Sequence, residues 1–137
     1  MAPTKDYDIT NDEELQTAVR HRTQYTQTEL DDPSLNGAIN TAKRILATEF
    51  GGHVNFYDDR GLTRALFGAA CIEAKCRVEN EATASYNLGN EIDVEVRDSD
   101  GNSLQVGRYE SDIQRGMKNA NQSRDVQMLG NTSGFIG

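Results

Sequence analysis

The sequence has no long apolar run, and this absence excludes a membrane-spanning helix. Hydrophobic residues make up 36% of the 137 positions, and no stretch approaches the roughly 18 apolar residues that a span needs. The opening residues, MAPTKDYDIT, have neither the apolar core nor the cleavage pattern of a signal peptide. We therefore expect one compact domain that stays in the cell that makes it and contacts no membrane.

Cysteine and histidine are scarce, which limits redox, metal and acid–base chemistry. Cys71 and Cys76 are the only cysteines, and five positions separate them by about 140° around a helix. They cannot form a relaxed disulfide within that helix, so we expect buried free thiols. His21 and His53 each stand alone and are expected at the surface or at a helix end.

Motifs that carry catalysis or bind cofactors are also missing from the sequence. There is no glycine-rich nucleotide loop, no paired-cysteine zinc pattern and no histidine-rich metal motif. No nucleophile, base and stabilising group can be named together. We therefore predict that the protein is not an enzyme, that it has no catalytic residue and no metal site, and that it uses no cofactor.

Positive charge is scarce as well, and lysine is especially rare. The 22 acidic residues outnumber the 14 basic ones, giving a formal charge of −8, and four of the basic residues are lysine. Such a surface repels phosphate backbones and anionic membranes. The composition suggests a salt-loving host, because the Debye length in concentrated salt falls to about 3 Å and a dense carboxylate surface no longer repels itself strongly. An ordinary acidic protein remains the alternative.

Hydrophobic periodicity predicts two helices in the first 50 residues. The first begins near Asn11, after a capping box formed by Thr10 and Glu13. The second lies in DDPSLNGAINTAKRILATEFGG, where Asp32–Pro33 supplies the N-cap and first-turn proline and two glycines end the helix. Its apolar residues recur every three or four positions, so one face must pack on another element.

A third helix is predicted over residues 62–82, LTRALFGAACIEAKCRVENEA. Its first half is apolar nearly all round, which is typical of the most buried helix in a bundle. The small residues 68–70 would let another helix approach closely. A weaker, polar helix is predicted later in the chain, in RYESDIQRGMKNANQSR at residues 108–124.

A β-hairpin is predicted between these helices, at residues 91–107, EIDVEVRDSDGNSLQVG. Gly101 supplies the positive-φ position of its turn, and it falls at the wrong position for a calcium loop, so we predict a plain turn. A lone hairpin is marginal in water. We therefore expect its apolar residues to pack on helices or to form an interface with a second copy. These predicted subunit-interface residues are Ile92, Val94, Val96, Leu104 and Val106.

The last predicted unit is an extended C-terminal arm, residues 125–137, DVQMLGNTSGFIG, which follows a helical domain at residues 1–124. A solvated end would not need apolar side chains, so we interpret this segment as an arm that orders on a partner. A frayed end with scattered hydrophobic residues is the alternative. The candidate partner-binding residues are Val126, Met128, Leu129, Phe135 and Ile136. The predicted fold is thus mainly α, a small helical bundle with an inserted β-hairpin and this arm.

The order of these parts over residues 10–120 resembles that of the head–tail adaptor (connector) proteins of tailed viruses. The resemblance is based on the two segments AINTAKRILATEFG and LTRALFGAACIEAKCRVENEA. The acidic, lysine-poor composition makes the chain look like a version from a virus of halophilic archaea. The resemblance implies a ring of about twelve copies, with viral DNA passing through its channel without sequence-specific binding. It also implies that the arm grips the portal protein, and an acidic channel lining would suit DNA transit.

We therefore expect a structural protein of the virion neck, made in the host cytoplasm, that joins the capsid portal to the tail. Its partners would be other copies of itself, the portal protein and an adjacent tail or neck protein. The alternative is a small cellular helical module, regulatory or antitoxin-like, whose apolar tail recognises a single protein.

Overall fold

The computed structural model describes residues 9–50, 54–79, 82–89 and 91–120. Its elements are α1 (Asp12–Thr23), α2 (Asp32–Glu49), α3 (Arg60–Val78), β1 (Thr83–Asn87) and β2 (Asp93–Arg97). The described part ends with a helix over residues 107–120, called here the 107–120 helix. The prediction of a mainly α fold with a small antiparallel hairpin is confirmed. The predicted arm at residues 125–137 lies outside the described residues.

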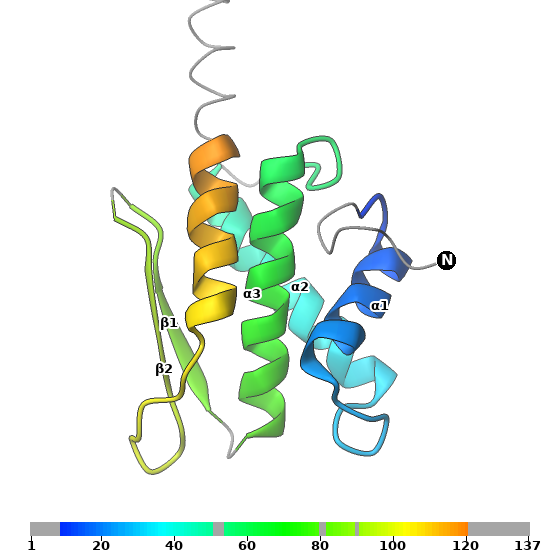
Figure 1. Cartoon of the computed structure of the whole chain (residues 1–137), viewed down its shortest axis with the longest axis vertical. Helices are drawn as coiled ribbons and strands as arrows, with labels where there is room; N and C mark the ends of the chain where they lie inside the picture. Colours follow the sequence, from blue (N-terminus) through cyan, green and yellow to red (C-terminus); the bar gives the residue numbers. More distant parts are fainter. Residues whose placement is uncertain (1–8, 51–53, 80–81, 90, 121–137) are drawn as a thin grey trace, which may run out of the picture.

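The third helix, α3, lies at the centre of the bundle (Figure 1). It has the 107–120 helix on one side and α1 on the other, α2 packs behind it, and the hairpin lies beyond the 107–120 helix. Twelve of its 19 residues are buried, from Gly61 to Cys76. The prediction that this apolar helix forms the core is confirmed, and both cysteines are buried free thiols as expected.

Side-chain caps set where α1 and α2 begin, although not with the residues that we predicted. The N-cap of α1 is Asn11, whose Oδ1 accepts a hydrogen bond from the Glu14 amide at 2.9 Å. The Glu14 carboxylate in turn accepts from the Thr10 amide at 2.7 Å. The cap is therefore shifted by one residue from the predicted Thr10, because asparagine caps at least as well as threonine. The Glu14 side chain binds the residue before the cap, so the predicted reciprocal box between Thr10 and Glu13 does not form. Similarly, α2 is capped by Asp31 and not by Asp32.

The 107–120 helix packs antiparallel on α3 through three glycines, Gly61, Gly68 and Gly116, which we call the glycine contact. A Cβ added at Gly61 would lie 2.6 Å from the Gly116 carbonyl oxygen, and one added at Gly68 would lie 2.6 Å from the Tyr109 carbonyl oxygen. Both neighbours are backbone atoms, so no side-chain rotation could relieve the clash. The predicted close approach at residue 68 is confirmed.

The hairpin differs from the prediction in its choice of partner strand. β2 pairs antiparallel with β1, from Thr83 opposite Arg97 to Asn87 opposite Asp93, and not with a strand at residues 104–106. The predicted turn does form, with Gly101 at φ 86°. Beyond it, however, the chain makes one bridge, between Arg97 and Ser103, before it enters the 107–120 helix.

The hairpin obtains its missing support from helices of the same chain. The Tyr86 hydroxyl donates to the Glu73 carboxylate of α3 at 2.6 Å. The Val94 amide donates to Glu110 at 2.8 Å, and the Gln114 side chain donates to the Ile92 carbonyl at 2.9 Å. A two-stranded sheet is thereby anchored to α3 and to the 107–120 helix, as such a small sheet requires.

Candidate functional site

The predicted subunit-interface residues of the hairpin belong to the core of the chain itself. Val94, Val96 and Val106 are 6%, 1% and 7% exposed, and Ile92 and Leu104 are partly buried against the same core. Val94, Val96 and Val106 are therefore used in the core of their own chain, whereas a subunit interface that includes the partly buried Ile92 and Leu104 stays a prediction. The predicted portal-binding residues lie outside the described residues: Val126, Met128, Leu129, Phe135 and Ile136.

A different surface gathers charged side chains from three helices around one buried acid. Asp112 of the 107–120 helix is 9% exposed. Its Oδ1 accepts a hydrogen bond from Arg64 Nε of α3 at 3.1 Å, and its Oδ2 lies 3.7 Å from Arg22 Nη1 of α1. One carboxylate thus joins the three helices, next to the glycine contact that brings the 107–120 helix against α3.

The local sequence explains why further arginines share this surface. Arg108 precedes Asp112 by four residues and Arg115 follows it by three, so all three residues lie on one face of the 107–120 helix. Arg22 lies in the last turn of α1, where a cation is favoured by the helix dipole. Its guanidinium carbon is 5.2 Å from the centroid of the Phe67 ring, within the range of a cation–π contact.

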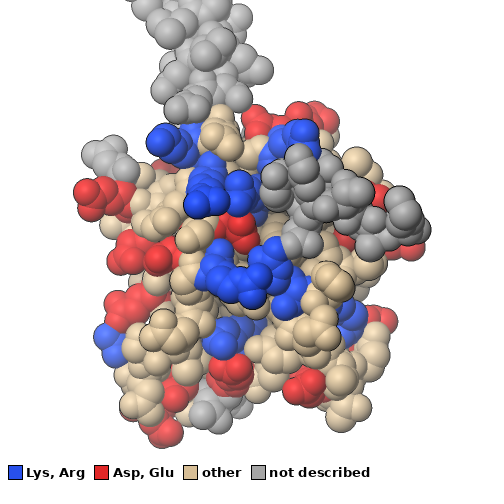
Figure 2. Space-filling view, viewed as in Figure 1, with Lys and Arg blue, Asp and Glu red and all other residues tan. Residues whose placement is uncertain are grey.

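We call the four arginines around Asp112 the arginine face: Arg22, Arg64, Arg108 and Arg115. Four positive charges and one carboxylate sum to +3, although the whole chain carries a formal charge of −8. Figure 2 shows lysine and arginine gathered over the middle of this side of the molecule, with most acidic side chains around its margin. Arg108 and Arg115 are exposed, whereas Arg22 and Arg64 are partly buried. The arrangement suits binding to an acidic surface.

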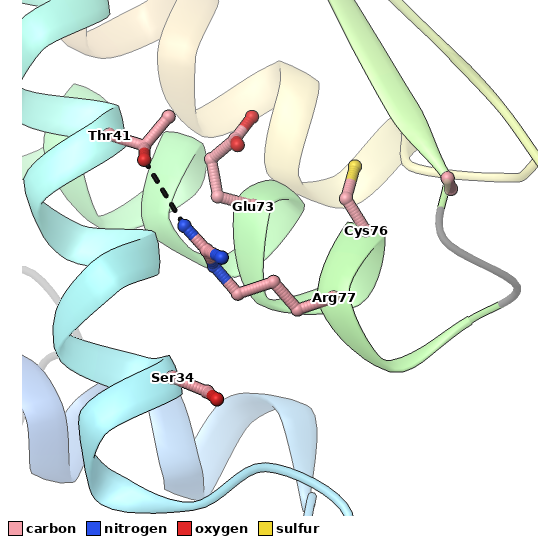
Figure 3. A pocket seen from close by; sticks show the side chains of 6 residues that line it. Ser34, Thr41, Glu73, Cys76 and Arg77 are labelled. Carbon is pink, nitrogen blue, oxygen red and sulfur yellow. Dashed lines mark hydrogen bonds between the residues drawn. The ribbon is translucent and has the colours of Figure 1, made fainter.

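A polar groove lies on another side of α3, between α2 and the start of β1. It is lined by Ser34, Thr41, Glu73, Cys76, Arg77 and Ala82. Figure 3 shows Arg77 reaching from α3 toward α2, where its Nη2 donates to Thr41 Oγ1 at 3.2 Å. Burial raises the pKa of the Cys76 thiol to about 12, so this thiol is protonated at neutral pH and is a poor nucleophile.

The described residues contain no metal-ligand cluster and no membrane-spanning helix. No group of three or more histidine, cysteine, aspartate or glutamate side chains in this part of the chain could hold a metal ion. Within the same ranges, no helix combines the length and apolarity that crossing a bilayer requires.

Asp98 accepts hydrogen bonds from the amides of Asp100 and Asn102, both at 2.9 Å, so this acid completes the turn that we predicted there.

Comparison with known proteins adds no family to this picture. No family model, no curated protein and no solved structure matches the chain. Function is therefore inferred from the residues of this chain and from their geometry. The sequence signal for the arginine face was present as the spacing of Arg108, Asp112 and Arg115, but the contributions of α1 and α3 required the three-dimensional structure.

Proposed function

We propose that the chain is a structural protein of the virion neck, which assembles into a ring that joins the capsid portal of a tailed virus to its tail. The observation that carries the proposal is the arginine face on a strongly acidic molecule. A closed ring is built from head-to-tail contacts, in which one patch of each copy docks on a different patch of the next. A basic face and an acidic remainder supply two complementary patches.

Exposed carboxylates on the hairpin are available as the acidic counterpart. Glu91 and Asp93 are exposed, and Asp93 lies on the sheet side opposite the buried Val94 and Val96, whereas the neighbouring Glu95 forms an ion pair with Arg97 of its own strand. In a ring, other carboxylates would face the central channel, where their charge repels passing DNA and prevents it from adhering. The number of copies, about twelve, the portal contact of the arm and the neighbouring tail protein follow from the resemblance and are part of the proposal.

The test is the state of assembly of the purified chain, alone and with the portal protein, from low to multimolar salt. We expect rings in negative-stain electron micrographs and a matching mass by light scattering. Arg115→Glu should prevent ring formation while the chain stays folded, because it places a carboxylate in the arginine face. Arg44→Glu, on the exposed side of α2, is the matched control and should assemble normally. Assembly of Arg115→Glu to the wild-type extent would contradict the proposal.

A monomeric binding module is the second candidate, and the packing of the hairpin on its own helices favours it. In that case the chain is regulatory or antitoxin-like, and the arginine face binds an acidic partner protein. The same experiment separates the two functions. A chain that stays monomeric at every salt concentration and does not associate with the portal supports the module and excludes the ring.

A further inference from the structure

Two opposite charges on α3 have the spacing of an ion pair but do not form one. Glu73 precedes Arg77 by four residues, which is the spacing and the order in which an acid and a base on a helix attract each other best. Lys75 and Glu79 have the same spacing in the less favourable order, and Lys75 Nζ does lie 3.2 Å from Glu79 Oε2. Within the described residues, neither Glu73 nor Arg77 takes part in an ion pair.

Contacts with two other elements hold the Glu73 and Arg77 side chains apart. The Tyr86 hydroxyl of β1 donates to Glu73 Oε2 at 2.6 Å, and Arg77 Nη2 donates to Thr41 Oγ1 of α2 at 3.2 Å. Gly37 gives the guanidinium room against α2, because a Cβ there would lie 3.3 Å from Arg77 Nη2. Figure 3 shows the two charged side chains extending in different directions from α3. The separation of these charges is thus built into the packing of α2, α3 and β1.

Both charged groups can still bind a ligand in the polar groove that they line. The groove holds about 490 Å³, which is within the size range of small-molecule sites. Arg77 is exposed and Glu73 is partly buried. In the described part of the chain, Glu73 Oε1 accepts no hydrogen bond, and Arg77 donates from one nitrogen only. Burial and then the Glu73 carboxylate raise the pKa of the Cys76 thiol to about 12, although Arg77 lowers it, so this lining residue adds no third charge.

We propose that the polar groove binds a small zwitterion, a free α-amino acid, whose carboxylate pairs with Arg77 and whose ammonium group pairs with Glu73. A simple anion would be repelled by Glu73 and a simple cation by Arg77, whereas a ligand with both signs matches the groove. The Cβ atoms of two residues at this spacing are about 5–6 Å apart, so the ligand must carry its charges close together. An α-amino acid carries both on one carbon. This site is separate from the arginine face and does not depend on ring formation.

The first test compares three probes on the full-length chain by NMR shifts of the amides that line the groove. Glycine is the zwitterion common to all α-amino acids, acetate is the anion alone and methylammonium is the cation alone. The salt concentration is the lowest at which the chain stays folded, because salt screens exposed charges. We expect glycine to bind about tenfold more tightly than either other probe. Acetate or methylammonium binding as tightly as glycine would overturn the zwitterion site, and so would the absence of shifts at about 100 mM glycine.

The second test removes each charge while keeping its hydrogen bond within the chain. Glu73→Gln retains an oxygen that can accept from Tyr86, and Arg77→Gln retains a donor for Thr41. Each change should weaken glycine binding about tenfold, and Glu73→Gln should not weaken acetate binding. Lys75→Gln removes a cation of the same helix that does not line the groove and is the control, with glycine affinity equal to wild type. Wild-type glycine affinity in both Glu73→Gln and Arg77→Gln would overturn the proposal.

Discussion

The two sides of α3 differ in how much space they leave. Toward the 107–120 helix, Gly61 and Gly68 bring the two backbones into contact with no room for a methyl group. Toward α2 and β1, the same helix leaves a groove lined by Glu73, Cys76 and Arg77. The first side fixes the relative positions of two helices and hence the arginine face above them. The second side has both space and polar groups, which a binding surface needs.

The largest expected effect comes from filling the tight side. In Gly116→Val, the new Cβ would meet the Gly61 carbonyl and lie 2.6 Å from the Ala65 nitrogen. We expect a loss of about 3 kcal/mol in the free energy of unfolding and a midpoint temperature lower by roughly 10 °C. Gly107→Ala, with no atom within 4 Å of the new methyl group, should leave the midpoint unchanged. Equal midpoints for the two variants would show that the helices are not in backbone contact.

The next effect concerns the acid that joins the three helices on this tight side. Asp112→Ala leaves the partly buried guanidinium groups of Arg22 and Arg64 without their shared carboxylate. We expect the free energy of unfolding to fall by about 2 kcal/mol. This is less than for a fully buried pair, because both arginines are about one-fifth exposed. Urea unfolding measures this change in the free energy of unfolding. Asp100→Ala, on the exposed turn, is the control, and an equal cost for both changes would contradict a stabilising role for Asp112.

A smaller effect is expected at the start of α1, which is held by local contacts and not by close helix packing. Asn11→Ala removes the side-chain acceptor of the Glu14 amide and should cost about 1 kcal/mol. Hydrogen exchange should show faster exchange in the first turn of α1 and no change at Gly68. The same chemical change at Asn40, exposed within α2, should be neutral or slightly stabilising. Equal amide exchange rates in the first turn of α1 in both variants would show that Asn11 does not cap this helix.

The smallest effect is a dependence on acid pH. Hydrogen bonds from the Thr10 side chain and backbone lower the pKa of Glu14, and a backbone hydrogen bond from Ser34 lowers the pKa of Asp31. A carboxyl with a lowered folded-state pKa stabilises the fold above its ordinary value, about pH 4, and the stabilisation is lost as the pH falls through the folded-state value.

Below about pH 4, the first turns of α1 and α2 should therefore lose amide protection before the middle of α3 does. At Gly61, the contact of α3 with the backbone of Gly116 and Ala120 involves no carboxyl group. Hydrogen exchange at a series of acid pH values measures the difference. Simultaneous loss of protection in all three helices would show that the caps do not act locally.

Most of the helices could be predicted because their signals are local. The 3.6-residue spacing of Leu35, Ala38, Ile39 and Ala42 identifies the buried face of α2. Asp59 caps α3, which begins at Arg60, two residues before the predicted start. A difference of one or two residues at a helix end reflects neighbouring polar side chains that cap almost equally well.

The strand partner could not be predicted in the same way. TASYN has one large apolar side chain and little alternation, whereas Leu104 and Val106 look like a returning strand. In the structure, Val106 is 7% exposed at the entrance to the 107–120 helix, so core packing draws the chain away from the sheet. Likewise, the arginine face depends on Arg22 and Arg64, which are far from Asp112 in sequence. Contacts of this kind depend on tertiary packing.

The glycine contact also affects how the protein can fold while it is being synthesised. Gly61 meets Gly116, a partner 55 positions later in the chain. During translation, the apolar side of α3 stays uncovered until the 107–120 helix has left the ribosome. Aggregation-prone surface is exposed during this time. The nascent chain is therefore expected to need either rapid translation through residues 79–106 or protection by a chaperone.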